Sequence, residues 1–135
     1  MTTVSNTHKT LADFINDAKS RITEVDIDKA EQLIIQGYKV LDVREPQEYE
    51  TSNIKGSINI PRGTIEPAAD FHFEGANPIL RDSRNDSWLV LCATGGRAAL
   101  ATDTLQHMGF TDIMTITGGM TAWENAGKEL NKPNR

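Results

Sequence analysis

Cysteine is nearly absent from this chain, because Cys92 is the only one among 135 residues. One thiol cannot form an internal disulfide, so a scaffold held together by disulfides is excluded. The three histidines and Cys92 show no spacing typical of a metal site, and no Cys-His dyad is evident from the sequence. The sequence therefore predicts no metal and no other cofactor.

A positive net charge and a long hydrophobic run are also missing. The formal net charge is −5, so we expect no general attraction to nucleic acid or to an anionic membrane. Residues 1–10 hold no apolar segment of the kind found in a signal peptide, and no stretch is long enough to span a bilayer. These absences predict a cytoplasmic protein, in a reducing compartment where a free thiol is stable.

Strand-forming and helix-forming segments alternate along the chain. Apolar runs predict five strands, at 22–25, 39–43, 57–60, 88–91 and 112–116. Capping and stop signals predict helices over 11–19, after Asp26, from Pro46, from Arg97 to Gly109 and after Gly119. The connection over 63–87 is rich in Pro, Asp, Asn and Gly, and we expect it to hold at most one short helix. The fold class is therefore α/β, with three layers: a mostly parallel five-stranded sheet and helices on both faces.

Length and composition fit one compact domain after a short extension. Hydrophobic residues make up 38% and charged residues 24% of the chain, as in an ordinary globular domain. We predict a helical N-terminal extension over 1–20, which covers the core or an edge of the sheet, and a domain over 21–135.

Cys92 stands where the apolar strand 88–91 ends and a glycine turn leads into a helix. Amides without a helical partner and the positive end of the helix dipole meet at such a place, and together they favour an anion. Thiols at helix N-termini are known to ionise more readily than free cysteine. A buried cysteine that only packs in the core is the alternative. The turn that follows favours the reactive interpretation.

That turn reads Ala93, Thr94, Gly95, Gly96 and Arg97. Two glycines permit tight backbone geometry, and successive amides in such a turn form an anion-binding nest. We expect the amides over 94–97 to donate to the sulfur, which should be reachable from solvent. The Thr94 hydroxyl either donates to the sulfur or bonds its own backbone. The Arg97 guanidinium either holds an incoming oxyanion or pairs with a carboxylate at the surface.

Four motifs in order resemble the single-domain rhodanese family of thiosulfate sulfurtransferases, over about residues 22–130. They are 41–45 (LDVRE), 54–63 (IKGSINIPRG), 92–97 (CATGGR) and 118–123 (GGMTAW). The resemblance implies that Cys92 takes a sulfane sulfur from an anionic donor such as thiosulfate and holds it as a persulfide. The acceptor, which is cyanide, a thiol or a sulfur-carrier protein, must come from outside because the chain has no second cysteine. Family members often carry serine where this chain has Ala98.

Loop length separates this interpretation from cysteine phosphatases and arsenate reductases, which have a similar fold. Their loop is one residue longer, whereas four residues separate Cys92 from Arg97 here. A smaller ring suits a single sulfur atom better than a tetrahedral phosphate. A non-catalytic rhodanese-like binding module is the other alternative, and it would be expected to lack the cysteine.

Three further charged residues are predicted to support the site. Asp42 and Arg44 follow the short apolar run over 40–41, at the edge where parallel sheets bind ligands, and the resemblance places them beside the cysteine loop. We expect them to hold that loop and shape its mouth. Arg62 either attracts the anionic donor or is an ordinary surface arginine.

Overall fold

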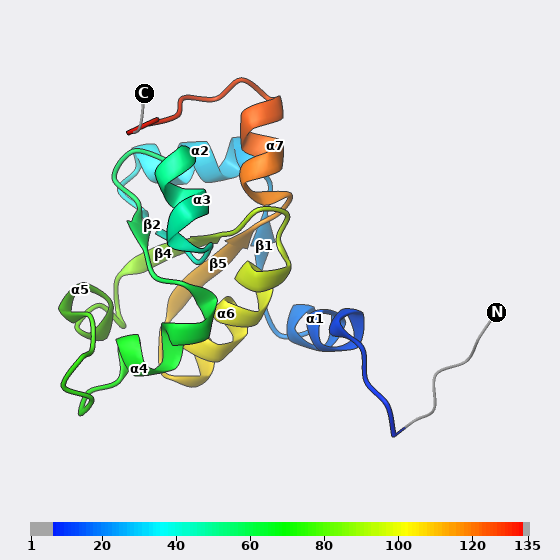
Figure 1. Cartoon of the computed structure of the whole chain (residues 1–135), viewed down its shortest axis with the longest axis vertical. Coiled ribbons are helices and arrows are strands. Elements are labelled where there is room, and N and C mark those ends of the chain that lie inside the picture. Colours follow the sequence, from blue (N-terminus) through cyan, green and yellow to red (C-terminus); the bar gives the residue numbers. More distant parts are fainter. Residues whose placement is uncertain (1–6, 134–135) are drawn as a thin grey trace.

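The computed structural model describes residues 7–133 and contains one five-stranded sheet (Figure 1). Every strand pairs in parallel with its neighbours, in the order β1-β5-β4-β2-β3. The strands are β1 (Glu24–Val25), β2 (Lys39–Asp42), β3 (Ile58–Asn59), β4 (Ser87–Leu91) and β5 (Asp112–Ile116). The predicted parallel sheet is confirmed.

Helices cover both faces of the sheet, which makes the predicted three layers (Figure 1). One face carries α2 (Ile27–Ile35) and α7 (Gly119–Asn125), and the other carries α4 (Ile65–Ala69), α5 (Pro78–Arg81) and α6 (Gly96–His107). The short α3 (Pro46–Thr51) follows β2, and α1 (Leu11–Lys19) lies against α6. The α/β fold class is therefore as the sequence predicted.

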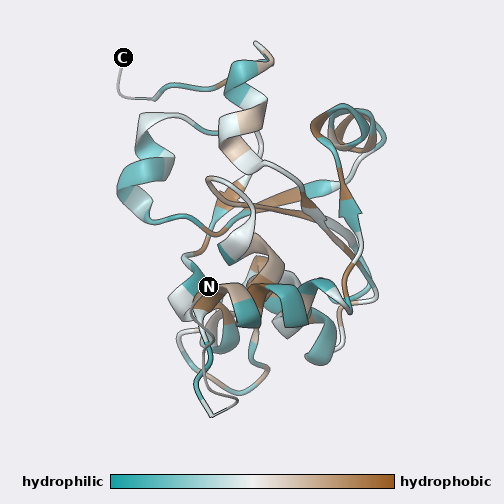
Figure 2. Ribbon diagram, turned by 90° about the vertical axis from the view of Figure 1, so that its right-hand side faces the viewer, coloured by the Kyte–Doolittle hydropathy of each residue, from teal (hydrophilic) through white to brown (hydrophobic). Residues whose placement is uncertain are grey.

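β4 lies in the middle of the sheet because its side chains are apolar on both faces. Trp88 and Val90 pack in the cluster on the α6 side, while Leu89 and Leu91 pack in the cluster on the α2 and α7 side. Figure 2 shows the hydrophobic residues concentrated on the strands at the centre of the molecule. Burial on both faces is typical of a parallel sheet between helices.

Register brings the ends of two strands together at the site. β2 pairs with β4 so that Asp42 stands opposite Leu91, the residue before Cys92. The amide of Val43 donates to the carbonyl oxygen of Leu91 at 2.8 Å. The turn after β2 therefore lies beside the cysteine, at the carboxyl edge of the sheet, where ligands bind in this class of fold.

The connection over 63–87 holds more structure than predicted. A 3-10 turn (Arg62–Thr64), α4 and α5 all lie in or at this segment. α4 forms because Ile65, Ala68 and Ala69 share one buried face. α5 starts at Pro78 because the Asn77 side chain accepts from the amide of Ile79 at 3.0 Å. Turn-forming residues masked these signals, and the expectation of at most one short helix is wrong.

Two strands are shorter than expected, with β1 confined to Glu24–Val25 and β3 to Ile58–Asn59. Both lie at the edges of the sheet, where only one neighbour supplies ladder hydrogen bonds. No helix within residues 7–133 is long and apolar enough to cross a membrane.

Candidate active site

The Cys92 side chain is held by two backbone amides of the loop that follows β4. The amide of Gly95 donates to Sγ at 3.0 Å, and the amide of Ala98 donates at 3.3 Å. Gly95 is the N-cap of α6, and Ala98 lies in its first turn. Two amides at a helix N-terminus therefore point at one sulfur, which is an arrangement that stabilises negative charge there. We call this arrangement of Cys92, Gly95 and Ala98 the cradle.

The cradle differs in detail from the expected one. The donors to Sγ among residues 7–133 are the amides of Gly95 and Ala98, whereas the sequence suggested the amides over 94–97. The Thr94 hydroxyl donates to neither the sulfur nor its own backbone in this part of the chain, and the Thr94 side chain is exposed. The difference arises because α6 begins one residue earlier than predicted, which turns the amide of Ala98 toward the strand end.

Cys92 is buried, with an exposed fraction of 1%. It belongs to the hydrophobic cluster on the α6 side, because the buried strand β4 carries it inward and the first turn of α6 folds over it. The expectation of a sulfur reachable from solvent is therefore wrong for this conformation. A reactant can reach Sγ only by displacing the groups that cover it.

The backbone of the cysteine is fixed by the first turn of α7. The amide of Met120 donates to the carbonyl oxygen of Cys92 at 2.8 Å, and the amide of Thr121 donates to that of Ala93 at 3.0 Å. Gly119 stands so close to the Cys92 carbonyl that a Cβ there would collide with it. This close approach explains the glycine in the last of the four sequence motifs.

Arg97 pairs with a carboxylate that sequence analysis missed. Its guanidinium bonds both oxygens of Glu48 on α3, at 2.7 and 3.1 Å. This hydrogen-bonded pair lowers the pKa of Glu48 from its usual 4.5 to about 2 and raises the pKa of Arg97. Glu48 is also fixed by the amide of Glu45, which donates to it at 2.9 Å. Of the two alternatives for Arg97, the structure contains the carboxylate pair.

Asp42 and Arg44 form a buried ion pair beside the cradle. The shortest contact joins Nη2 of Arg44 to a carboxylate oxygen of Asp42 at 2.8 Å, and both side chains are nearly inaccessible. The same Nη2 donates to the carbonyl oxygen of Ser52 at 2.8 Å, and Nη1 donates to that of Glu48 at 3.3 Å. Arg44 thus holds α3, which carries the partner of Arg97.

Arg62 does not join the cradle. Its guanidinium donates to the hydroxyl of Thr104 and to a carboxylate oxygen of Glu66, both at 3.2 Å. Thr104 lies eight residues along α6 from Gly96, which is about 12 Å of helix. The Nε of Arg62 is buried and has no partner in the described chain. The structure therefore brings Cys92, Asp42, Arg44 and Arg97 into one neighbourhood and leaves the Arg62 head group outside it.

Glu48 and Ala98 are the site residues that sequence reasoning missed. In the structure Glu48 belongs to a capping box at the start of α3, and nothing in the sequence connects it to Arg97, 49 residues away. Ala98 was noted only for lacking a hydroxyl, although its amide is the group that matters. No group of three metal-ligating side chains is found within residues 7–133.

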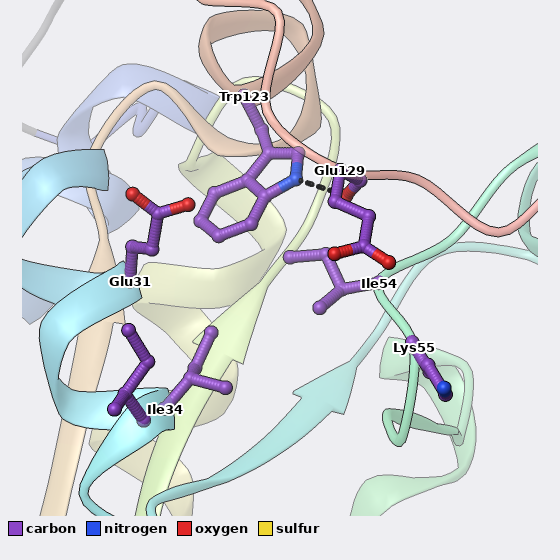
Figure 3. A pocket seen from close by; sticks show the side chains of 7 residues that line it. Glu31, Ile34, Ile54, Lys55, Trp123 and Glu129 are labelled. Atoms are coloured by element: carbon purple, nitrogen blue, oxygen red, sulfur yellow. Dashed lines mark hydrogen bonds between the residues drawn. The ribbon is translucent and has the colours of Figure 1, made fainter.

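A cavity of about 270 Å³ lies on the opposite side of the sheet, between α2 and α7 (Figure 3). Ile34, Ile54 and Trp123 form its apolar walls, with Glu31 and Glu129 at its rim. The indole of Trp123 donates to the carbonyl oxygen of Glu129 at 2.9 Å. Lys55 also lines this cavity, whereas no thiol or hydroxyl side chain is among its lining residues.

The structure is an α/β fold with a cysteine held by backbone amides at the carboxyl edge of a parallel sheet. The Rhodanese-like domain family matches residues 26–126. The chain belongs to this family, as its motifs indicated, and several of its relatives are named thiosulfate sulfurtransferases.

Two curated relatives carry sulfur-related names. The chloroplastic thiosulfate sulfurtransferase 16 of Arabidopsis thaliana is 34% identical over 115 residues, which is 81% of this chain and 93% of that protein. The suggested sulfur carrier protein YrkF of Bacillus subtilis is 30% identical over 106 residues, which is 77% of this chain but only 52% of that protein.

One solved structure is similar along nearly the whole chain. It is a protein of unknown function from Rhodopseudomonas palustris, described as a possible tyrosine phosphatase. It is 30% identical, has a TM-score of 0.85, and the match covers 97% of this chain and 99% of that one. At that coverage the likeness extends beyond residues 26–126 into the region of α1.

Proposed function

We propose that this protein transfers a sulfane sulfur from an anionic donor such as thiosulfate to a thiophilic acceptor, through a persulfide on Cys92. The observation that carries the proposal is the pair of amide hydrogen bonds to Sγ, from Gly95 and Ala98. Donors fixed in advance around a developing anion stabilise it without reorganisation, so the same amides suit both the thiolate and the persulfide. The sulfurtransferase relatives support the same chemistry.

The reaction proceeds in two displacements. The Cys92 thiolate attacks the outer sulfur of thiosulfate, the sulfur–sulfur bond of the donor breaks, and sulfite leaves with the electron pair. A nucleophile, either cyanide or a thiolate, then attacks the outer sulfur of the persulfide and releases the Cys92 thiolate. The acceptor comes from outside because the chain has one cysteine.

Asp42, Arg44 and Arg97 have supporting roles in this proposal. Arg97 ties the start of α6 to α3 through Glu48, and Arg44 ties α3 to the end of β2. The donor meets a covered sulfur, so it must move part of the loop over 93–97 to reach Sγ. Thr94 is the exposed residue of that loop and is the first that a donor would meet.

A cysteine phosphatase is the second candidate, favoured by the description of the Rhodopseudomonas palustris protein. The short loop opposes it, because four residues between Cys92 and Arg97 leave little room for a phosphoryl group. In addition, the Arg97 guanidinium is already bonded to both carboxylate oxygens of Glu48, which competes with a bound phosphoryl group. A binding module without catalysis is the third candidate, and the presence of Cys92 in the cradle argues against it.

Intact-mass analysis after incubation with thiosulfate tests the proposal. Wild type should gain the mass of one sulfur atom, and Cys92→Ser should gain none. Hydrolysis of an aryl phosphate by wild type is measured in parallel. Phosphate release without sulfur uptake would establish the phosphatase instead, and the absence of both reactions would favour the binding module.

The natural acceptor and the location are further parts of the proposal. The net charge of −5 does not favour cyanide over a thiol or a sulfur-carrier protein as the acceptor. The relative YrkF is named as a sulfur carrier protein, so a carrier is one acceptor to test. We retain the cytoplasm as the predicted location.

A further inference from the structure

Helix α1 lies outside the matched family domain, which begins at residue 26, yet it packs on the first turn of α6, beside the cradle. Of its apolar residues, Leu11 and Phe14 are 68% and 57% exposed, whereas Ile15 is half-buried and Ala18 is buried. The more buried side of α1 faces the domain, and α1 packs mainly on α6. Figure 1 shows α1 lying beside α6 and away from the other helices.

The contact of α1 that lies nearest the cradle is the contact of Ile15 with Gly96. A Cβ on Gly96 would stand 2.9 Å from Cδ1 of Ile15, so the glycine leaves room for that methyl group. Gly96 is the first residue of α6 and lies between Gly95 and Ala98, the sources of both amides that bond Sγ. Ile15 therefore rests on the backbone that carries the cradle.

The two adjacent glycines are glycine for different reasons. Gly95 has a φ of +119°, a left-handed conformation that side chains disfavour. Gly96 does not have a positive φ, so its backbone alone would accept alanine. An added Cβ at Gly96 would meet the end of the Ile15 side chain, so either that methyl group or the first turn of α6 would have to shift. The glycine therefore allows Ile15 to pack directly on the backbone of α6.

Independent bonds hold α1 in this place. The guanidinium of Arg21, just after α1, bonds both oxygens of Asp103 on α6, at 2.9 and 2.8 Å, and both oxygens of Asp17, at 3.2 and 2.8 Å. The Gln106 side chain donates to the carbonyl oxygen of Arg21 at 3.0 Å. These contacts anchor the end of α1 to the second half of α6, while Ile15 reaches its first turn.

We propose that Ile15 of α1 is a positioning residue for the reaction: by packing on Gly96 it fixes the first turn of α6, so that the amides of Gly95 and Ala98 face Cys92. This inference rests on the proposed function and extends it to a helix outside the family domain. Its physical basis is that amides stabilise a developing anion only while they are held in place, and small misplacements are costly.

A double-mutant cycle with one methyl group on each side tests the proposal. Gly96→Ala adds a Cβ against Cδ1 of Ile15, and Ile15→Val removes that Cδ1, after which the next atom, Cγ1, is 3.8 Å away. We measure single-turnover sulfur uptake from thiosulfate at saturating donor. Gly96→Ala should slow the maximum rate about tenfold, less than the hundredfold or more lost with a whole donor, and adding Ile15→Val should restore most of it.

The half-saturating thiosulfate concentration should change little in the cycle, because the cradle acts on the reacting sulfur more than on donor binding. Phe14→Ala is the matched control, since it truncates an exposed residue of the same helix and should leave the rate unchanged. Thermal unfolding of each variant confirms that the domain is folded. If Gly96→Ala is equally slow with and without Ile15→Val, or is as fast as wild type, the proposal is wrong.

Alkylation of Cys92 by iodoacetamide separates this inference from the proposed function, since it needs no sulfur donor. Its rate should change several-fold in Gly96→Ala and return toward wild type when Ile15→Val is added. If wild type takes up no sulfur while this coupling persists, the proposed function fails and the role of α1 stands. If sulfur uptake occurs while both cycles show no coupling, α1 is only a cover and the function stands.

Discussion

The two faces of the sheet differ, because one carries Cys92, the proposed nucleophile, and the other carries a cavity. On the α6 side, Cys92 is buried under two amides with almost no exposed surface. On the α2 and α7 side, a cavity of about 270 Å³ has Trp123 and Ile54 in its wall and no thiol or hydroxyl side chain among its lining residues. The proposed nucleophile, Cys92, is therefore distinguished by the backbone amides that bond its sulfur and not by this cavity. Substitutions on the two sides should accordingly change different measurements.

The largest effect is expected from Gly95→Ala. Alanine at a φ of +119° is strained, so the backbone should shift and turn its amide away from Sγ. We expect sulfur uptake from thiosulfate to fall about a hundredfold or more, as on removal of one anion-binding donor. Single-turnover mass spectrometry measures this rate.

Gly37→Ala is the matched control for that experiment. Gly37 has a similar φ of +108°, follows α2 far from the cysteine, and has no atom within 4 Å of the position of an added Cβ. Both substitutions should cost roughly 1–2 kcal/mol of stability, but only the one in the cradle should slow the reaction. Equal rates in the two variants would show that the amide of Gly95 does not assist the sulfur.

On the cavity side, Ile54→Ala should lower stability and leave the rate of sulfur uptake nearly unchanged. Ile54 is 4% exposed and packs in the cluster with Trp123, so truncation should lower the free energy of unfolding by about 2–4 kcal/mol. Sulfur uptake by the folded variant should stay within about twofold of wild type, because no cradle atom is touched. Urea unfolding and single-turnover rates check the two halves of this expectation.

Ile35→Ala serves as its control, because Ile35 lines the same cavity but is 81% exposed. Its stability should change by less than about 0.5 kcal/mol. A loss of rate in Ile54→Ala at full stability would mean that the cavity communicates with Cys92, and the separation of the two sides would not hold.

Local sequence signals were sufficient for the regular elements. Asp26 caps α2 by accepting from the amide of Lys29 at 2.8 Å, and Gly109 ends α6, as their residue types predicted. These features depend on neighbours a few residues away. The same applies to the position of Cys92 at the end of β4, which the apolar run over 88–91 and the glycine turn after it located.

The features of the site that the sequence did not predict depend on packing between distant segments of the chain. The pairing of Arg97 with Glu48 spans 49 residues, and the contact of Ile15 with Gly96 joins α1 to a loop more than 80 residues later. The burial of Cys92 is also tertiary, because it depends on how α6 folds over the strand end. Residue type marked the cysteine as reactive, but only the fold determines which amides face it and what covers it.

Glu48→Gln tests a smaller, pH-dependent contribution of the Glu48–Arg97 ion pair to the free energy of unfolding. The pKa of Glu48 is lowered in the folded protein from 4.5 to about 2, mainly by Arg97, so the unfolded chain binds the proton more tightly than the folded one. Stability from this pair is therefore fully present above about pH 4.5 and is lost as the pH falls toward 2. Since both side chains are 37% exposed, we expect about 1 kcal/mol at most near neutral pH.

Urea unfolding of wild type and Glu48→Gln, at neutral pH and near pH 2, checks both the sign and the size. The difference in free energy between the two proteins should be largest near neutral pH and should be much smaller near pH 2, because there about half of the folded wild-type carboxyl groups are protonated. High salt should reduce it, as for any partly exposed pair. A difference that persists unchanged in acid would mean that Glu48 acts through its bond to the amide of Glu45, and that Arg97 is not tied to α3 by charge.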